Sequence, residues 1–305
     1  MKNPNFFIIG APKCGTTALA AYLGAHESVF ISPMKEPFFW SSDIPPPWGD
    51  QVLDFPRNLN EYLRLFGDAG EDHLAVGEGS TTYIWSEVAV DRILAFAPEA
   101  KFIAMVRNPI QLARTLHSTE VYFFNEPEKD FETAWRLGHE RAKSPDQGIR
   151  TRLNYRRIAS LGTQLDRFIS RVPSPQRHII LFDEFAANTK ACYEEVLRFL
   201  GVPSDGRIEF PVINAAGTHR FDSVAHFVMQ PPRWVGSLVR VFRPLFRRLG
   251  LRHLRGRVLS VLTRPIRKVP LKSDFHAELA NAFRDEILLM SRLLGKDFSH
   301  WLDPK

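Results

Sequence analysis

The chain has 305 residues, of which 44% are hydrophobic and 24% are charged, a balance that excludes collagen-like, low-complexity and disordered proteins. No apolar run approaches the roughly 20 residues that a membrane-spanning helix needs. Two cysteines in the whole chain exclude a disulfide-stabilised scaffold. The apolar run near the N-terminus is too short for a secretory signal peptide. We therefore expect a reduced protein of the cytoplasm.

The net charge of +6 is unevenly distributed along the chain. The 51 residues between Asp222 and Asp274 contain no acidic residue and 12 arginines and lysines. The remaining 28 basic and 34 acidic residues leave the rest of the chain at −6. The basic character is therefore local.

Short apolar runs alternate with helical patterns along the chain, which indicates a parallel sheet covered by helices. The expected strands have a nearly continuous apolar character, which is typical of strands buried on both faces. They are Phe6–Ile9, Val29–Ile31, Leu74–Gly77, Lys101–Val106 and His178–Phe182. The predicted fold class is therefore α/β.

Helical patterns follow most of these strands, and each begins at a residue that can open or cap a helix. The expected helices begin at Thr16, Asn58, Ser86, Pro109, Phe131, Tyr155 and Asn188. Asn188 can cap the helix over Thr189–Leu200, which Gly201 would end. A final amphipathic helix is expected over about Asp274–Leu294.

The chain shows no internal repeat and no glycine- or serine-rich linker, so we expect a single domain over 1–305. Its parts would be a core at about 1–222, a basic helical segment at about 223–273 and a C-terminal helix at about 274–305. Residues 41–57 are rich in proline and tryptophan, which predicts an irregular loop.

The strongest local pattern joins the first strand to the first helix. The strand breaks at Gly10, and a Pro-Lys-x-Gly turn leads into a helix at Thr16 and Thr17. Free backbone N–H groups and the positive end of a helix then meet at one point, which is the geometry that binds phosphate. Lys13 adds a cation, but it lies two residues before Gly15, whereas the ordinary pattern G-x4-G-K-[ST] has lysine after the second glycine. A magnesium-dependent ATPase needs its lysine at that other position.

Four stretches together resemble the sulfotransferases that use 3′-phosphoadenosine-5′-phosphosulfate (PAPS). Pro12-Lys13-Cys14-Gly15-Thr16-Thr17 resembles their 5′-phosphosulfate loop, and Lys35-Glu36-Pro37-Phe38-Phe39 resembles their K-E-P-x-F-F segment. Gly77–Tyr83 resembles the G-E-x-[ST]-x-x-Y segment, and Lys101–Pro109 resembles the strand and R-[DN]-P turn that bind the 3′-phosphate. The similarity is to bacterial cytosolic members related to the heparan sulfate branch, and it extends over nearly the whole chain. It implies a P-loop-type parallel sheet flanked by helices, with extra C-terminal helices.

The resemblance also implies which residues bind the donor. The 5′-phosphosulfate would be held by Pro12, Lys13, Cys14, Gly15, Thr16 and Thr17. Arg107 and Thr115 would hold the 3′-phosphate, although Leu112 stands where many members have a second arginine. Arg220 is a candidate to complete this clamp, because related proteins close a loop with glycine and a basic residue over the nucleotide. The product would be 3′-phosphoadenosine-5′-phosphate (PAP).

Glu78 is the predicted general base, because it follows a strand at the carboxyl edge of the sheet and the resemblance to the heparan-type branch implies a glutamate in that role. Glu36 is an alternative base, or it could orient Lys13, which would carry the leaving-group interaction. Glu78 could instead be a loop carboxylate paired with a nearby arginine. His117 lies where relatives often have an aromatic residue, and we expect it to pack.

The cysteines and histidines show no metal-ligand spacing, so no metal is expected. Positive potential at the phosphate loop would lower the pKa of Cys14, which is nevertheless expected to be a spacer.

The basic segment interleaves apolar and basic residues over 231–268. It could lie on an anionic membrane as a peripheral contact, line a groove for an acidic saccharide, or form a helical cap whose arginines are solvated. No nucleic-acid recognition motif accompanies the charge, so no nucleic acid is expected.

The sequence therefore predicts transfer of a sulfuryl group from PAPS to a hydroxyl or amine of a saccharide, a lipid or a small metabolite. One alternative is a P-loop kinase or NTPase, since Ile179–Glu184 is similar to a magnesium-binding strand end. Another is a non-catalytic module that binds anions or membranes.

Overall fold

The computed structural model describes residues 2–45, 55–213, 217–219, 263–265 and 270–304. Its centre is a five-stranded parallel sheet with the strand order β2-β3-β1-β4-β5. These strands are β1 (Phe6–Gly10), β2 (Val29–Ile31), β3 (Ala75–Gly79), β4 (Lys101–Val106) and β5 (Arg177–Leu181). Every residue of β1 is buried, as expected of the central strand of a sheet covered on both faces.

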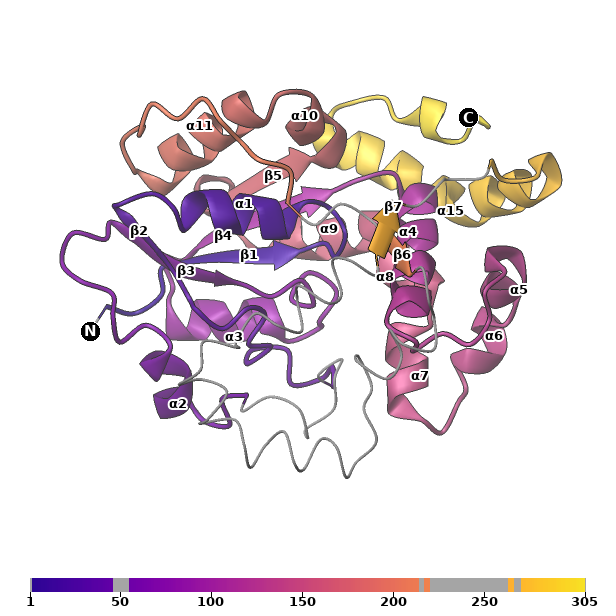
Figure 1. Cartoon of the computed structure of the whole chain (residues 1–305), viewed down its shortest axis with the longest axis horizontal. Helices are drawn as coiled ribbons and strands as arrows, with labels where there is room; N and C mark the ends of the chain where they lie inside the picture. The colour runs from indigo at the N-terminus through magenta and orange to yellow at the C-terminus, as the bar shows by residue number, and fades with distance from the viewer. Residues whose placement is uncertain (1, 46–54, 214–216, 220–262, 266–269, 305) are drawn as a thin grey trace.

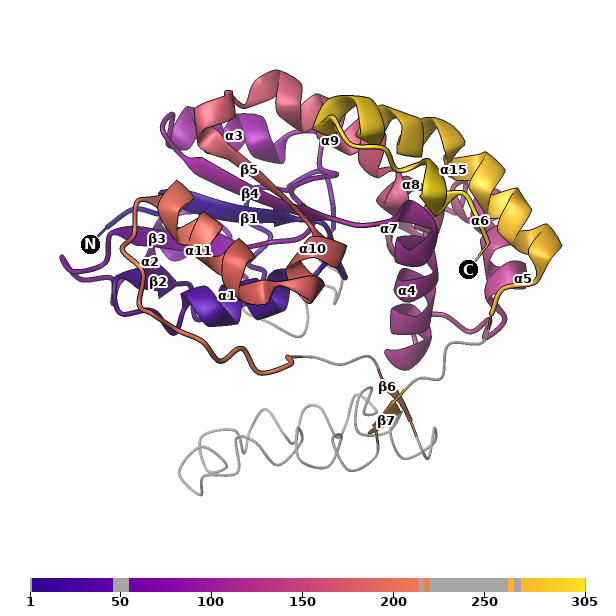
Figure 2. The ribbon, with the colours of Figure 1, turned by 90° about the horizontal axis from the view of Figure 1, so that it is seen from above.

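Helices cover both faces of the sheet (Figures 1 and 2). One face carries α1 (Thr16–Leu23), α10 (Phe182–Ala187) and α11 (Thr189–Leu200), and the other carries α3 (Ala89–Phe96) and α9 (Leu161–Arg171). A shorter helix, α2 (Leu59–Arg64), precedes β3. The predicted α/β fold with a covered parallel sheet is thus confirmed.

A group of helices lies beyond the carboxyl ends of the strands (Figure 1). The longest is α4 (Pro109–Tyr122), and it packs against α8 (Tyr155–Ala159). The smaller helices there are α5 (Phe131–Arg136), α6 (Gly138–Arg141) and α7 (Gln147–Arg152). The C-terminal helix α15 (Ser273–Leu294) packs along α9 and α4, and the short helix η3 (Ser299–Trp301) follows it.

Two further elements lie outside this core. The strands β6 (Gly217–His219) and β7 (Thr263–Pro265) form an antiparallel pair beside α4. The short helix η1 (Ser174–Gln176) leads into β5. Arg220 and, apart from β7, the basic segment 231–268 lie outside the described residues.

The expected strands all occur, with ends that differ by one or two residues. Phe182 was assigned to the last strand, but it opens α10. The helix expected at Ser86 begins at Ala89, and the Ser86 hydroxyl, three residues earlier, accepts the Ala89 N–H at 3.0 Å. Asn58 and Asn188 cap α2 and α11 as expected.

Some helices have no counterpart in the prediction, namely α6, α7, α9 and α10. The irregular loop over 41–57 is consistent with residues 41–45 and 55–57, which contain no helix or strand, while residues 46–54 lie outside the described part. Within the described residues, no helix combines the length and the apolar character that crossing a membrane requires.

Candidate active site

The loop between β1 and α1 has a backbone that only particular residues can adopt. Gly10 has a φ of 136°, and a Cβ there would lie 2.7 Å from the backbone oxygen of Thr81. Gly15 precedes α1 with a φ of 90°, in the left-handed region that favours glycine. Because no side chain caps this helix, the first amides of α1 remain directed into the loop, as phosphate binding requires.

Lys13 and Cys14 have pKa values that burial controls. The pKa of Lys13 is lowered, first by burial and then by the nearby ammonium of Lys35. Cys14 is fully buried, with its Sγ 3.4 Å from the carbonyl oxygen of Pro12. Burial raises the pKa of the Cys14 thiol to about 12, although Arg107 and Lys13 act in the opposite direction. The expected lowering is therefore wrong, since desolvation outweighs the positive potential.

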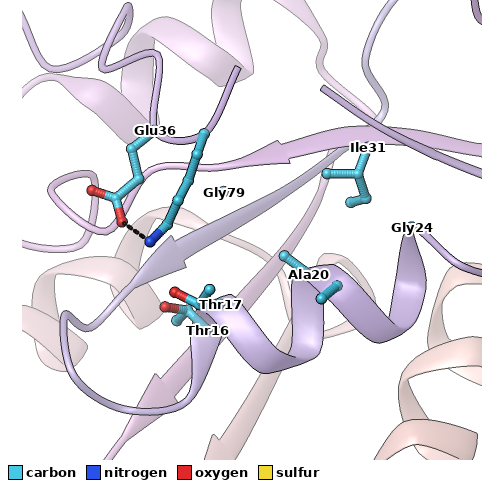
Figure 3. A pocket seen from close by; sticks show the side chains of 9 residues that line it. Thr16, Thr17, Ala20, Gly24, Ile31, Glu36 and Gly79 are labelled. Atoms are coloured by element: carbon cyan, nitrogen blue, oxygen red, sulfur yellow. Dashed lines mark ion pairs between the residues drawn. The ribbon is translucent and has the colours of Figure 1, made fainter. Parts of the chain in front are cut away.

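A pocket of about 320 Å³ opens at the amino end of α1. The side chains that line it come from α1, from the chain after β2 and from the end of β3 (Figure 3). They are Thr16, Thr17, Ala20, Ala21, Gly24, Ile31, Lys35, Glu36 and Gly79. The pocket thus combines Thr16 and Thr17 of the predicted phosphate loop with the carboxylate of Glu36 and the ammonium of Lys35.

Glu36 is the carboxylate of this pocket. It lies above the start of α1, where Thr16 and Thr17 stand, and its Oε1 is 3.8 Å from Nζ of Lys35 (Figure 3). Burial raises the pKa of Glu36, while Lys35, Lys13 and the side chain of Thr81 partly oppose the shift.

Glu78, the predicted base, has different surroundings. Its side chain is fully buried and does not line the pocket, whereas the next residue, Gly79, does. Successive residues of a strand point to opposite faces, so Glu78 faces away from the phosphate loop. The carboxylate accepts hydroxyl hydrogen bonds from Tyr83 at 2.6 Å, Ser80 at 2.8 Å and Tyr62 at 3.3 Å.

Burial raises the pKa of Glu78 to about 7, against the lowering effect of these three hydroxyls. The alternative in which an arginine pairs with it is not what the structure shows, because hydroxyls surround its carboxylate.

Arg107 follows β4 and connects the phosphate loop to α4. Its guanidinium donates to the backbone oxygen of Lys13 at 3.1 Å and to Oε1 of Gln111 at 2.9 Å. It also lies over the ring of Phe182, with Cζ 4.4 Å from the ring centre. Nε of Arg107 is buried and has no hydrogen-bond partner among the described residues. Burial lowers the pKa of this guanidinium.

The residues after Arg107 are arranged along α4. Asn108 caps the helix by accepting from the amides of Ile110 and Gln111. Thr115 donates its hydroxyl proton to the backbone oxygen of Gln111 at 2.7 Å. Leu112 is fully buried in the core, so the absent second arginine is replaced by an apolar contact.

Two residues near this site were not among the predicted ones. Gln111 was missed, although its spacing of four from Arg107 puts both on one face of a helix. Glu120 was also missed. Burial raises its pKa, against the lowering effects of the Asn125 hydrogen bond, of Arg152 and, least, of Lys13. The expected packing role of His117 fits the structure, since it is buried against Phe131 and Tyr155.

The candidate magnesium ligands of the kinase alternative are Asp183 and Glu184, which follow β5. Asp183 and Glu184 lie in the first turn of α10, and the carboxylate of Glu184 is paired with Lys296. Across the part of the chain that is described, no three His, Cys, Asp or Glu side chains are arranged to hold a metal ion.

The comparison with protein families gives one match, because the profile of the sulfotransferase family fits residues 4–206. Among curated proteins, the human bifunctional heparan sulfate N-deacetylase/N-sulfotransferase 2 is 28% identical over 236 residues, which are 74% of this chain and 24% of that protein. The carbohydrate sulfotransferase 15 of Mus musculus is 31% identical over 160 residues, which are 39% of this chain and 27% of that protein. The chain thus spans about a quarter of the length of these relatives.

Among solved structures, a sulfotransferase from Alicyclobacillus acidocaldarius matches with a TM-score of 0.73 and 24% identity, over 99% of this chain and 100% of that one. This similarity supports the fold. The family profile covers well over half of the chain, from the first strand to the end of α11. The chain therefore belongs to the sulfotransferase family of enzymes.

Proposed function

We propose that the protein transfers a sulfuryl group from PAPS to a hydroxyl or amine acceptor. The observation that carries the proposal is the pocket in which Glu36 stands over the amino end of α1, beside the phosphate loop. The start of α1 that would bind the donor's phosphate, a carboxylate that can act as a base and the ammonium of Lys35 then lie in one site. Family membership supports the same reaction class.

The residues of the site fit a nucleotide with a 5′-phosphosulfate and a 3′-phosphate. The amides of Gly15, Thr16 and Thr17 at the start of α1 suit the 5′ group. The buried Nε of Arg107, which is without a hydrogen-bond partner among the described residues, suits the 3′ group, since an unpaired buried donor is costly. Thr115 and Gln111 line the same side of α4.

In the proposed reaction the base is a glutamate, either Glu78, as the sequence predicts, or Glu36, which lines the pocket. Bound PAPS supplies the sulfuryl group, whose sulfur exchanges its bond to the 5′-phosphate oxygen for a bond to the acceptor oxygen or nitrogen. This carboxylate accepts the proton that the acceptor loses. Burial raises the pKa of both glutamates, which makes each a stronger base than an exposed carboxylate. Lys13 offsets the negative charge left on the 5′-phosphate.

Binding of the product is the first test. Calorimetric titration with PAP should show tight binding, and titration with ATP and magnesium should show none. The reverse result would favour the kinase alternative and overturn the proposal.

The role of Glu36 is tested by Glu36→Gln. We expect turnover to fall by roughly a hundredfold to ten-thousandfold, the usual contribution of a general base, with PAP affinity retained. Glu71→Gln is the control, because the side chain of Glu71 is 97% exposed at another edge of the molecule. A Glu36→Gln variant with full activity would contradict a role of Glu36 as the base and leave Glu78 in that role.

We propose a saccharide as the first acceptor to screen. The relatives that match are named for heparan sulfate and for carbohydrate, and a sugar offers both hydroxyls and amines. Lipids and small metabolites form the second set of the screen.

Peripheral membrane contact through residues 231–268 is a separate proposal, supported by their interleaved basic and apolar residues. Replacing Arg247 and Arg248 by Glu should reduce binding to anionic vesicles, and unchanged binding would discard it. A cytoplasmic location stays a prediction.

A further inference from the structure

The residues that follow α15 fold back onto the start of α4 and onto α10. The helix ends at Gly295, whose φ is 62°, and the next residues lead into η3. In Figure 2 this end of the chain lies beside the start of α4. We call the six residues Lys296–Trp301 the C-terminal clasp.

Contacts within the clasp and to α15 fix its shape. Phe298 and Trp301 are buried, and their rings stack with 4.2 Å between the ring centres. The carboxylate of Asp297 accepts the amide of Ser299 at 2.8 Å and the hydroxyl of the same residue at 3.0 Å. The amide of Phe298 donates to Oγ of Ser291 in α15 at 3.1 Å. The clasp is therefore a packed part of the fold.

The first contact of the clasp with the donor site is made by Asn108, which directly follows Arg107. The side-chain oxygen of Asn108 accepts the amides of Ile110 and Gln111 at 2.8 and 3.4 Å and so caps α4. Its side-chain amide donates to the backbone oxygen of Trp301 at 3.3 Å. Aspartate caps a helix as well as asparagine does, but it has no N–H for this second bond. Asn108 thus joins the start of α4 to the clasp.

The second contact of the clasp is with α10. The ammonium of Lys296 pairs with the carboxylate of Glu184 in this helix. Both side chains are about half exposed, so this ion pair is the weaker of the two links. The same helix begins at Phe182, whose ring lies against the guanidinium of Arg107. The clasp therefore contacts both elements that border Arg107.

The orientation of Arg107 matters because its charge is buried and has no ion pair among the described residues. Its guanidinium donates to the backbone oxygen of Lys13 and to the side-chain oxygen of Gln111. A buried cation without a counter-ion is costly, and a 3′-phosphate would supply that counter-ion. A guanidinium binds phosphate best through two parallel hydrogen bonds, so its plane must be held in one direction. The elements beside Arg107 therefore determine how well it can bind the phosphate.

We propose that the C-terminal clasp is a positioning element of the donor site. It holds Asn108, and with it the turn that carries Arg107, and so sets the preference of the enzyme for a nucleotide with a 3′-phosphate. The inference rests on the proposed use of PAPS as the donor. Asn108 and Trp301 are positioning residues in this role, because they act through Arg107 and need no contact with the nucleotide.

Two variants weaken the contact from opposite sides. Asn108→Ser keeps an oxygen that can cap α4 but removes the amide N–H that reaches Trp301. Trp301→Leu removes the ring that stacks on Phe298 and so loosens the clasp. The matched control is Phe283→Leu, which replaces another buried aromatic ring of the C-terminal region. Phe283 is 0% exposed, and its ring packs on Trp135 of α5.

The first measurement compares two nucleotides that differ only in the 3′-phosphate. The full-length wild type and each variant are titrated calorimetrically with PAP and with adenosine 5′-phosphate. The dissociation constant for PAP should rise at least about fivefold in Asn108→Ser and in Trp301→Leu, and that for adenosine 5′-phosphate should stay within about twofold. Both constants should stay within about twofold of the wild type in Phe283→Leu. An unchanged constant for PAP, or an equal rise for both nucleotides, would overturn the proposal.

The double variant of Asn108→Ser and Trp301→Leu tests whether the two residues act through one contact. If they do, its dissociation constant for PAP should lie within about twofold of that of the weaker-binding single variant, because residues of one network are not additive. A rise equal to the product of the two single effects would contradict a shared role.

The second measurement needs no nucleotide. The Nε–H of Arg107 is buried, so its proton should exchange slowly with water in NMR spectra of the wild type labelled with ¹⁵N-arginine, and Arg107→Lys assigns the signal. The exchange should become at least about fivefold faster in Asn108→Ser and Trp301→Leu, and stay unchanged in Phe283→Leu. Equal exchange in all these proteins would overturn the positioning role. If the wild type binds no PAP, the proposed function fails, while this exchange still decides the role of the clasp.

Discussion

Glu78 and Glu126 are both buried, and each accepts a hydrogen bond of 2.6 Å from a buried tyrosine, yet their pKa values move in opposite directions. Burial raises the pKa of Glu78 to about 7. The pKa of Glu126 is lowered, although burial opposes this, because Arg141 donates to both of its oxygens at 2.6 and 2.7 Å. One guanidinium accounts for the difference.

The comparison separates two uses of a buried carboxylate. At Glu126 the charge is compensated, so the pair joins α6 to the chain before α5. At Glu78 hydroxyls are the partners, so the carboxylate stays costly to ionise and its protonation changes near neutral pH.

The largest expected effect comes from removing the guanidinium of Arg141, which pairs with Glu126. Arg141→Met leaves a buried carboxylate without its partner, which should cost about 3–5 kcal/mol of unfolding free energy at neutral pH. Urea denaturation of the variant and the wild type measures this. The double variant with Glu126→Gln should regain part of the loss, because no uncompensated charge then remains. A loss below about 1 kcal/mol would mean that the pair behaves as an exposed one.

The second-largest expected effect is on stability: the contributions of Glu78 and Glu126 to the free energy of unfolding change with pH in opposite directions. Burial raises the pKa of Glu78 from its ordinary value of 4.5 to about 7. The stability that Glu78 contributes is therefore fully present below about pH 4.5 and is lost as the pH rises through about 7. The lowered pKa of Glu126 contributes stability above 4.5 that is lost as the pH falls through the folded value.

Unfolding free energies of Glu78→Gln and Glu126→Gln, measured from pH 4 to 8, test this prediction. Relative to the wild type, Glu78→Gln should gain stability as the pH rises from about 4.5 to 7, at no more than about 1.4 kcal/mol per pH unit for one proton. Glu126→Gln should lose stability relative to the wild type as the pH rises from acid toward 4.5. If the unfolding free energies of the two variants change with pH in parallel, Arg141 does not give the two carboxylates opposite pKa shifts.

The fold was predictable where one local pattern decides each element. Strands such as Lys101–Val106 are apolar on both faces, and the sheet confirms them. The start of α10 was missed because Phe182 continues the apolar run of β5, so hydrophobicity does not change where the strand becomes a helix. The helix α9 was missed because a break at the single residue Ser160 separates it from α8.

The site, like the fold, was predictable where one local stretch of sequence decides it. The phosphate loop is contiguous in sequence, so its glycines, lysine and threonines identify it together. The choice between Glu36 and Glu78 depends on which face of β3 a side chain occupies, and the flanking residues Gly77 and Gly79 have no side chain to indicate it. The hydroxyl of Tyr62 reaches Glu78 from α2 only through tertiary packing.

The smallest expected effect distinguishes the hydroxyls around Glu78. Tyr62 donates to Oε1 at 3.3 Å, and that oxygen keeps its 2.6 Å bond from Tyr83 when Tyr62 is replaced by Phe. The ring can still stack on Phe39. Tyr62→Phe should therefore lose less than about 1 kcal/mol in urea denaturation, whereas Tyr83→Phe should lose about 1.5–3 kcal/mol, the usual contribution of a hydrogen bond to a charged group. Equal losses would mean that the two tyrosine hydroxyls stabilise Glu78 equally despite their different distances from its carboxylate.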